Sequence, residues 1–307
     1  MLNLSHIEKA ARNPSLILKG VNNIGNRAFH TRLGCRDYNP AGINIFEEDW
    51  DNLLILDACR YDLFSDRAST LPGDLDYRIS RGSHSKEFVK ANFMDKRLHD
   101  VVYLSTNLFY ATLQPELGAE IHRFISVHEE ENWEDIHPTT PDLVTKHAKR
   151  TADEYPNKRL IVHYIQPHSP YIGPTGKKHF GSTDTPSAMW DRNNSELTDE
   201  ILQKAYCENL DMVLEDVREL LEYLPGKTVV TADHGELLGE RCYPIPLRNY
   251  GHPLGVYVEE LVKVPWHSYQ NGSRKRIVPE PPTSDSQSDI SDEYVQEQLK
   301  NLGYYDG

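Results

Sequence analysis

Two strand-like segments, far apart in the chain, both run directly into side chains that can bind a metal ion. The first, residues 52–56, leads to Asp57, and the second, residues 228–231, leads to an Asp-His-Gly-Glu stretch at residues 233–236. Buried parallel strands are typically short, continuous apolar runs, and their carboxyl ends share one edge of a sheet. The sequence therefore predicts that these distant residues meet at one site.

The remaining pattern alternates strands with helices. Further apolar runs occupy residues 101–104 and 160–165, and a helix is predicted from Pro141 to about residue 155, with proline at its first position. Leucine and valine recur at helical spacing from residue 198 to residue 224, which Pro225 and Gly226 follow. This alternation predicts an α/β fold, a three-layer sandwich with a mainly parallel sheet.

We expect the catalytic domain to occupy residues 46–266. Residues 1–45 are predicted to form a basic N-terminal arm, residues 267–291 a linker rich in Ser, Pro, Asp and Gln, and residues 292–307 a short amphipathic tail.

Composition narrows the class of protein. The chain has 307 residues, of which 38% are hydrophobic and 26% charged, as in soluble globular proteins, and its formal charge of −14 disfavours binding to nucleic acid. Its four scattered cysteines lack a Cys-x-x-Cys spacing, so neither a zinc knuckle nor a disulfide framework is indicated. With no apolar run long enough to span a bilayer and no secretory signal, we expect a cytoplasmic protein.

The first 36 residues depart from the acidic balance of the chain. Glu8 is their one acidic residue, and six basic residues accompany it: Lys9, Arg12, Lys19, Arg27, Arg32 and Arg36. A basic arm can make peripheral contact with an anionic membrane or bind an acidic partner, and the alternative is a solvated helix lying across the domain.

The metal ligands predicted from the strand ends are Asp57, Asp233 and His234, because carboxylate and imidazole together suit a divalent ion such as zinc or manganese. The alternative is that Asp57 caps a helix and His234 is an ordinary loop histidine. Two strand ends of the same kind favour the metal site.

Ser85 is the predicted nucleophile. It stands at the start of a short helical stretch, residues 86–92, where a hydroxyl bound to a metal ion can attack a phosphorus or sulfur centre. The helix start also favours an anionic substrate, since its backbone N–H groups point outward. The alternative is that Ser83 or Ser85 is an N-cap only.

Two histidines and two arginines complete the candidate site. His168 follows the strand at residues 160–165 in a loop held by two prolines, and can donate to an oxyanion or protonate a leaving group. His252 lies 19 positions after Asp233, close enough for its loop to fold back over the metal, although an exposed loop histidine is the alternative. Arg60 or Arg81 is predicted to neutralise a substrate oxygen.

Several short motifs, in this order, resemble the sulfatase-like branch of the alkaline phosphatase superfamily, with the nearest likeness to sulfatase-like proteins of haloarchaea. The resemblance spans about residues 46–306. The motifs are Leu-Asp-Ala-Cys-Arg-Tyr-Asp at 56–62, Arg-Gly-Ser-His-Ser at 81–85, Gln-Pro-His-Ser-Pro-Tyr at 166–171, Ala-Asp-His-Gly-Glu at 232–236, Gly-His-Pro at 251–253 and Leu-Gly-Tyr at 302–304.

The resemblance implies an alkaline phosphatase-like fold and a metal held by Asp57, Asp233 and His234, with Ser85 as both nucleophile and ligand. It also implies that His168 and His252 contact the transferred group. The chain lacks the Cys-x-Pro-x-Arg or Ser-x-Pro-x-Arg signature from which sulfatases make formylglycine, so an unmodified serine is expected. It also lacks an Asp-x-x-x-His pair before the last helix, which favours one metal ion, Ca²⁺, Mn²⁺ or Zn²⁺, over two.

The expected activity is therefore metal-dependent hydrolysis or transfer of a sulfate or phosphate ester. The substrate is expected to be anionic, with a glycan or a lipid-linked ester as candidates. The rival hypothesis is a catalytically degenerate relative that binds an anionic glycan or a partner through the same pocket.

Overall fold

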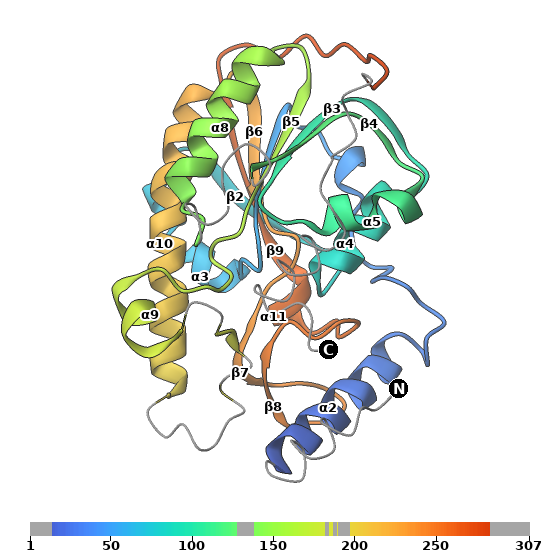
Figure 1. Ribbon diagram of the computed structural model, residues 1–307, viewed down its shortest axis with the longest axis vertical. Helices are drawn as coiled ribbons and strands as arrows, with labels where there is room; N and C mark the ends of the chain where they lie inside the picture. Colours follow the sequence, from blue (N-terminus) through green and yellow to red (C-terminus); the bar gives the residue numbers. More distant parts are fainter. Residues whose placement is uncertain (1–13, 128–137, 182–183, 187–188, 190–196, 283–307) are drawn as a thin grey trace.

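The computed structural model describes residues 14–127, 138–181, 184–186, 189 and 197–282. Its centre is a seven-stranded sheet in the order β2-β9-β6-β1-β5-β3-β4, with helices on both faces (Figure 1). Each neighbouring pair is parallel except the two pairs that β9 makes with β2 and β6, which are antiparallel. The predicted α/β sandwich with a mainly parallel sheet is confirmed.

The elements follow one another in the alternation predicted from the sequence. The strands are β1 (Asn52–Leu56), β2 (Asp74–Ile79), β3 (Arg97–Ser105), β4 (Glu120–Ser126), β5 (Arg159–Tyr164), β6 (Gly226–Thr231), β7 (Leu237–Arg241), β8 (Arg248–Gly251) and β9 (Lys263–Asn271). The helices are α2 (Pro14–His30), α3 (Tyr61–Ser65), α4 (Ser85–Phe93), α5 (Phe109–Leu117), α8 (Pro141–Glu154), α9 (Pro174–His179), α10 (Asp199–Tyr223) and α11 (Glu259–Val262), with short 3₁₀ turns at Ile45–Glu47 and Ala68–Thr70.

The three central strands position the candidate site. β1 lies between β5 and β6 and pairs in parallel with both, so the three strands end at one edge of the sheet. Every residue of β1 is buried, because helices cover both faces of a parallel sheet and leave no polar side of the strand. Asp57 leaves β1 at the same edge where Asp233 leaves β6.

Two apolar layers hold the helices onto the sheet. On one face α8 and α10 pack against β1, β5 and β6, and α10 contributes Leu210, Val213, Val217 and Leu220 at helical spacing. On the other face α4 and α5 pack through side chains such as Phe88, Phe93 and Leu113. The site at the sheet edge is thus enclosed between two well-packed layers.

A smaller unit lies below this edge in Figure 1, where the hairpin β7–β8 is flanked by α2. Asn26 joins the two: its side chain accepts from the backbone N–H of Ile245 at 2.8 Å. Of the helices in the described ranges, none combines the length and the apolar character needed to cross a membrane.

The boundary of the predicted linker is wrong at its start. Residues 267–271 complete β9, which pairs with both β2 and β6, and were not recognised because the segment has no continuous apolar run. Beyond β9 the chain continues along the sheet, where the N–H of Val278 donates to Asn157 O at 2.9 Å. The linker from residue 283 on and the predicted tail at 292–307 lie outside the described residues.

Candidate metal centre

Three of the predicted ligands converge. Asp57, Asp233 and His234 are fully buried, and each offers one ligand atom within 4.8 Å of the other two. Nε2 of His234 lies 3.6 Å from Oδ1 of Asp57 and 3.4 Å from Oδ2 of Asp233. Ser85 joins the group, since its Oγ is 3.2 Å from the same His234 nitrogen.

These separations suit a single metal ion. Tetrahedral ligands about 2.0–2.2 Å from one zinc ion are roughly 3.3–3.6 Å from each other. The donor set, two carboxylates, one imidazole and one hydroxyl, also matches the ligands that zinc and manganese accept. The residues present therefore fit the divalent ion that the sequence predicted.

The local charge is negative and buried. Burial raises the pKa of Asp233, but His234, His163 and hydrogen bonds from Ser85 and the Ala58 N–H together leave that pKa below its usual value. The amide of Asn107 donates to Oδ2 of Asp57 at 2.7 Å and orients that carboxylate. Two ionised carboxylates away from water are costly unless a positive charge compensates them.

A backbone contact fixes the orientation of His234. Nδ1 lies 2.8 Å from the carbonyl oxygen of Gly235, which can only accept, so Nδ1 carries the hydrogen and Nε2 presents its lone pair to Asp57 and Asp233. Burial lowers the pKa of His234, which keeps the ring neutral, as a metal ligand must be. A side chain at Gly235 would overlap the carbonyl oxygen of Glu260, which explains the glycine at this position.

Ser85 is the first residue of α4, as predicted, but it is not the N-cap. The N-cap is His84, whose Nδ1 accepts from the N–H of Lys86 at 3.1 Å. Ser83 has a structural role instead, since its hydroxyl donates to Glu87 and accepts from the N–H of Gly255 at 2.9 Å. Ser85 is thereby left to face His234.

A second group of ligand type lies beside the first. One ligand atom each of His168, Glu236 and His252 lies within 4.8 Å of the others. Nδ1 of His252 is 3.0 Å from Oε1 of Glu236, and the His252 ring centre is 4.5 Å from that of His234. The fold therefore brings the loop of His252 close to the site, as expected from the sequence.

Burial dominates the titration of this second group. It lowers the pKa of His168 and of His252 to about 4 and raises the pKa of Glu236 to about 7. Nδ1 of His168 lies 2.6 Å from the carbonyl oxygen of Ser169, so that nitrogen donates and Nε2 is the accepting atom. Asn209 of α10 holds the loop by donating to the carbonyls of His168 and Pro170.

The two predicted arginines do not reach the ligand atoms. Arg60 pairs with Asp62 at 2.6 Å and with Glu240, and a third contact goes to the backbone oxygen of Glu236. Arg81 donates to the carbonyl of Ala91 at 2.8 Å. Both guanidinium groups bind other groups of the protein, so their positions do not support the predicted contact with substrate.

The sequence reasoning missed Glu236, His84 and Asn107. Glu236 belongs to the quoted Asp-His-Gly-Glu stretch, and its spacing from His234 was the available signal. Asn107 and His84 gave none, since their place beside the site depends on the packing of β3 and α4. His163 is buried within β5, with Nδ1 2.8 Å from the Tyr103 hydroxyl.

No family model and no curated protein matches this chain. Similar solved structures do exist. One is the periplasmic domain of phosphoethanolamine transferase EptC from Campylobacter jejuni, 16% identical over 71% of this chain and 78% of that one, with a TM-score of 0.44. Another is a protein in the alkaline phosphatase superfamily from Vibrio parahaemolyticus, 12% identical over 80% of this chain and 65% of that one, with a TM-score of 0.39.

A third is the integral membrane lipooligosaccharide phosphoethanolamine transferase A from Neisseria meningitidis, 15% identical over 70% of this chain, with a TM-score of 0.40. The matched part of this chain spans only about half, 47%, of that protein. These identities and TM-scores are too low to assign a superfamily or a function to this chain. The sulfatase-like haloarchaeal branch stays a prediction.

Proposed function

We propose that the protein is a metal-dependent enzyme that hydrolyses or transfers phosphate esters, with Ser85 as its nucleophile. The observation that carries the proposal is the convergence of Asp57, Asp233, His234 and Ser85 in one buried cluster. A structural role alone does not require a hydroxyl beside two carboxylates and a neutral imidazole.

Asp57, Asp233 and His234 would hold the ion. A divalent cation there lowers the pKa of a neighbouring hydroxyl and stabilises negative charge on the oxygens of the transferred group. Burial of the cluster strengthens both effects, because water does not screen the charges.

Ser85 Oγ forms the new bond to phosphorus as the bond to the leaving oxygen breaks, which yields a phosphoserine and an alcohol. Its position at the first residue of α4 places the substrate anion near the N–H groups of that helix. In the second step water or an acceptor alcohol attacks the phosphoserine, and the free serine is restored.

His168 and His252 serve as acceptors in this scheme. At neutral pH a pKa of about 4 leaves both rings uncharged, and His168 already donates through Nδ1 to Ser169. The neutral rings are therefore suited to accept a hydrogen bond from the attacking water or alcohol, rather than to protonate a leaving group.

The test is a panel of aryl phosphates, aryl phosphodiesters and aryl sulfates, assayed after chelation and after reloading with Mn²⁺, Zn²⁺ or Ca²⁺. We expect turnover of a phosphate substrate only with metal, and a phosphoserine at residue 85 detectable by mass spectrometry after acid quenching. Turnover of the sulfate alone would move the assignment to the sulfatase-like activity.

The rival is a catalytically degenerate protein that binds an anionic glycan or partner at the same cluster. Metal-dependent binding of inorganic phosphate or sulfate without turnover of any ester would support that rival and overturn the enzymatic proposal.

A further inference from the structure

Helix α2 packs against the protein through its polar face. Asn22 and Asn26 are fully buried, and Asn26 contacts the backbone of Ile245 both as donor and as acceptor. The side chain of Asn23 accepts from Asn249 of β8 at 2.7 Å. Hydrogen bonds of these amides therefore help to fix the helix, together with the ring contact of Phe29 with Tyr243.

The opposite face of α2 is apolar and faces water. Val21 is 54% exposed and Ile24 is 73% exposed, and Ile17, Leu18 and Phe29 are also more than two-fifths exposed. Ile17, Val21 and Ile24 are spaced so that they form one stripe along the helix. An apolar stripe turned outward on a helix that buries asparagines indicates a partner with an apolar surface.

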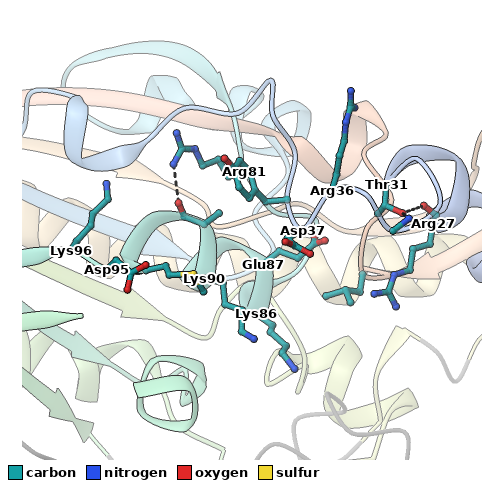
Figure 2. Close-up of a pocket in the computed structure, with 15 residues that line it drawn as sticks. Arg27, Thr31, Arg36, Asp37, Arg81, Lys86, Glu87, Lys90, Asp95 and Lys96 are labelled. Carbon is teal, nitrogen blue, oxygen red and sulfur yellow. Dashed lines mark hydrogen bonds between the residues drawn. The ribbon is translucent and has the colours of Figure 1, made fainter. Parts of the chain in front are cut away.

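A basic cavity lies at the C-terminal end of the same helix, where Arg27 stands three residues after Ile24. It has a volume of about 710 Å³, and Figure 2 shows Arg27 of α2 and Thr31, which follows this helix, on one side and Lys86 and Lys90 of α4 on the other. Three acidic residues line it, Asp37, Glu87 and Asp95. Six basic residues line it: Arg27, Arg36, Arg81, Lys86, Lys90 and Lys96. The cavity is therefore a positively charged region in a chain whose formal charge is −14.

Part of this positive charge is not compensated by the protein. Lys90 pairs with Glu116 at 2.6 Å, but among the described residues no salt bridge joins Arg27, Arg36 or Lys86 to a carboxylate. Such cations attract phosphate groups through charge and hydrogen bonds.

The cavity and the metal centre share helix α4, which contributes Lys86 and Lys90 to the cavity wall and Ser85 to the metal centre. Ser85 and the three candidate ligands are not among the described residues that line the cavity.

We propose that the apolar stripe of α2 and the basic cavity form one docking surface for a membrane that carries anionic phospholipids. The stripe lies in the boundary between headgroups and acyl chains, and the cavity takes a lipid phosphate. The docking follows from this surface alone and does not depend on the proposed function.

The experiment is cosedimentation of the full chain with vesicles. One set contains phosphatidylcholine alone and the other equal parts of phosphatidylcholine and phosphatidylglycerol, each at low and at high salt. We expect binding to the anionic vesicles, weakened by salt because the charge attraction is screened. Equal binding to both sets, or none, would overturn the proposal.

Two double variants separate the parts of the surface. Arg27→Gln with Arg36→Gln removes two charges and should weaken binding roughly thirtyfold, at about 1 kcal/mol per charge. Val21→Glu with Ile24→Glu should weaken it roughly a hundredfold or more, because charged side chains cannot enter the apolar layer.

Matched controls guard against a general effect of charge or shape. Lys177→Gln with Lys178→Gln removes two exposed charges from α9, and Ile24→Leu keeps the stripe apolar, so both should bind as the unchanged protein does. If the double glutamate variant instead alters the oligomeric state and leaves vesicle binding intact, the stripe is a contact between copies and the proposal is wrong. If inorganic tripolyphosphate displaces vesicles from the unchanged protein but does not affect vesicle binding by the Val21→Glu/Ile24→Glu variant, the cavity and the stripe do not act as one surface.

Failure of this inference and failure of the proposed function are distinguishable. Vesicle binding by Ser85→Ala tests docking without turnover, and the soluble aryl esters test turnover without docking.

Discussion

The two ends of strand β1 carry the same kind of side chain in opposite surroundings. At its start, Asp51 accepts from Arg274 at 2.5 Å, and the same guanidinium reaches Asp49 at 2.7 Å. At its end, imidazole rings lie against the carboxylates: His234 is 3.6 Å from Asp57 and 3.4 Å from Asp233. A second imidazole, that of His163, is 3.8 Å from Asp233. An arginine is always charged, whereas these buried imidazoles have lowered pKa values.

The difference distinguishes a structural carboxylate from a ligand. The amino end of β1 is neutralised by the protein itself, so it holds the chain together without an ion. The carboxyl end retains excess negative charge, which the proposed divalent cation would offset. Burial alone therefore does not show whether an aspartate is structural or a metal ligand. The charge of its neighbours must also be known.

The largest effect is expected from removing the nucleophile. Ser85→Ala should lower kcat at least about a thousandfold, because it removes the hydroxyl that lies against His234 and is proposed to form the covalent bond. The assay is release of the aryl alcohol by metal-loaded protein. Asp51→Asn, at the other end of the strand, is the comparison and should keep its turnover; equal losses in the two variants would break the distinction between the ends.

The second largest effect is expected on metal binding. Asp57→Asn keeps the shape of the side chain and removes one negative ligand, so we expect at least about a hundredfold weaker binding of Zn²⁺ or Mn²⁺. Calorimetric titration of chelated protein measures this. Retention of full affinity would show that Asp57 is not a ligand.

Asp51→Asn and Asp57→Asn should have different effects on the stability of the chelated protein. Asp51→Asn should reduce the free energy of unfolding by about 1–3 kcal/mol, because it removes the charge that Arg274 faces. Asp57→Asn should leave that free energy unchanged or raise it, since it relieves repulsion from Asp233. Denaturant titration without metal gives both values, and a loss at Asp57 as large as that at Asp51 would contradict the comparison.

The smallest effect concerns Asp49. Hydrogen bonding to Arg274 lowers the pKa of this carboxyl from 3.8 to about 2. A lowered folded pKa stabilises the protein above pH 3.8, and this contribution is lost as the pH falls through about 2. Asp49 is largely exposed, so solvent screening limits the effect to less than about 1 kcal/mol. Unfolding curves across this pH range should show it in the unchanged protein and lack it in Asp49→Asn.

Much of the site was predictable because its ligands follow strands that their own sequence identifies. Asp57 and Asp233 each end a run of apolar or β-branched residues, and Ser85 begins a helix, so local pattern and sheet geometry together were sufficient. Arg60 shows where this reasoning stops. It neighbours the site in sequence, yet its partner Glu240 comes from β7, and sequence spacing does not predict such a pair.

β9 was missed for a related reason. Its segment contains Pro265, His267 and Gln270, and reads as polar and irregular. It forms a strand because β2 and β6 supply hydrogen-bonding partners on both sides. Such a strand is specified by tertiary contacts more than by its own residues.

The central position of β1 also bears on when amide protons exchange with solvent. With β5 on one side and β6 on the other, its backbone opens last, after the outer strands β2 and β4 have separated. Amides of β1 should therefore exchange only through global unfolding.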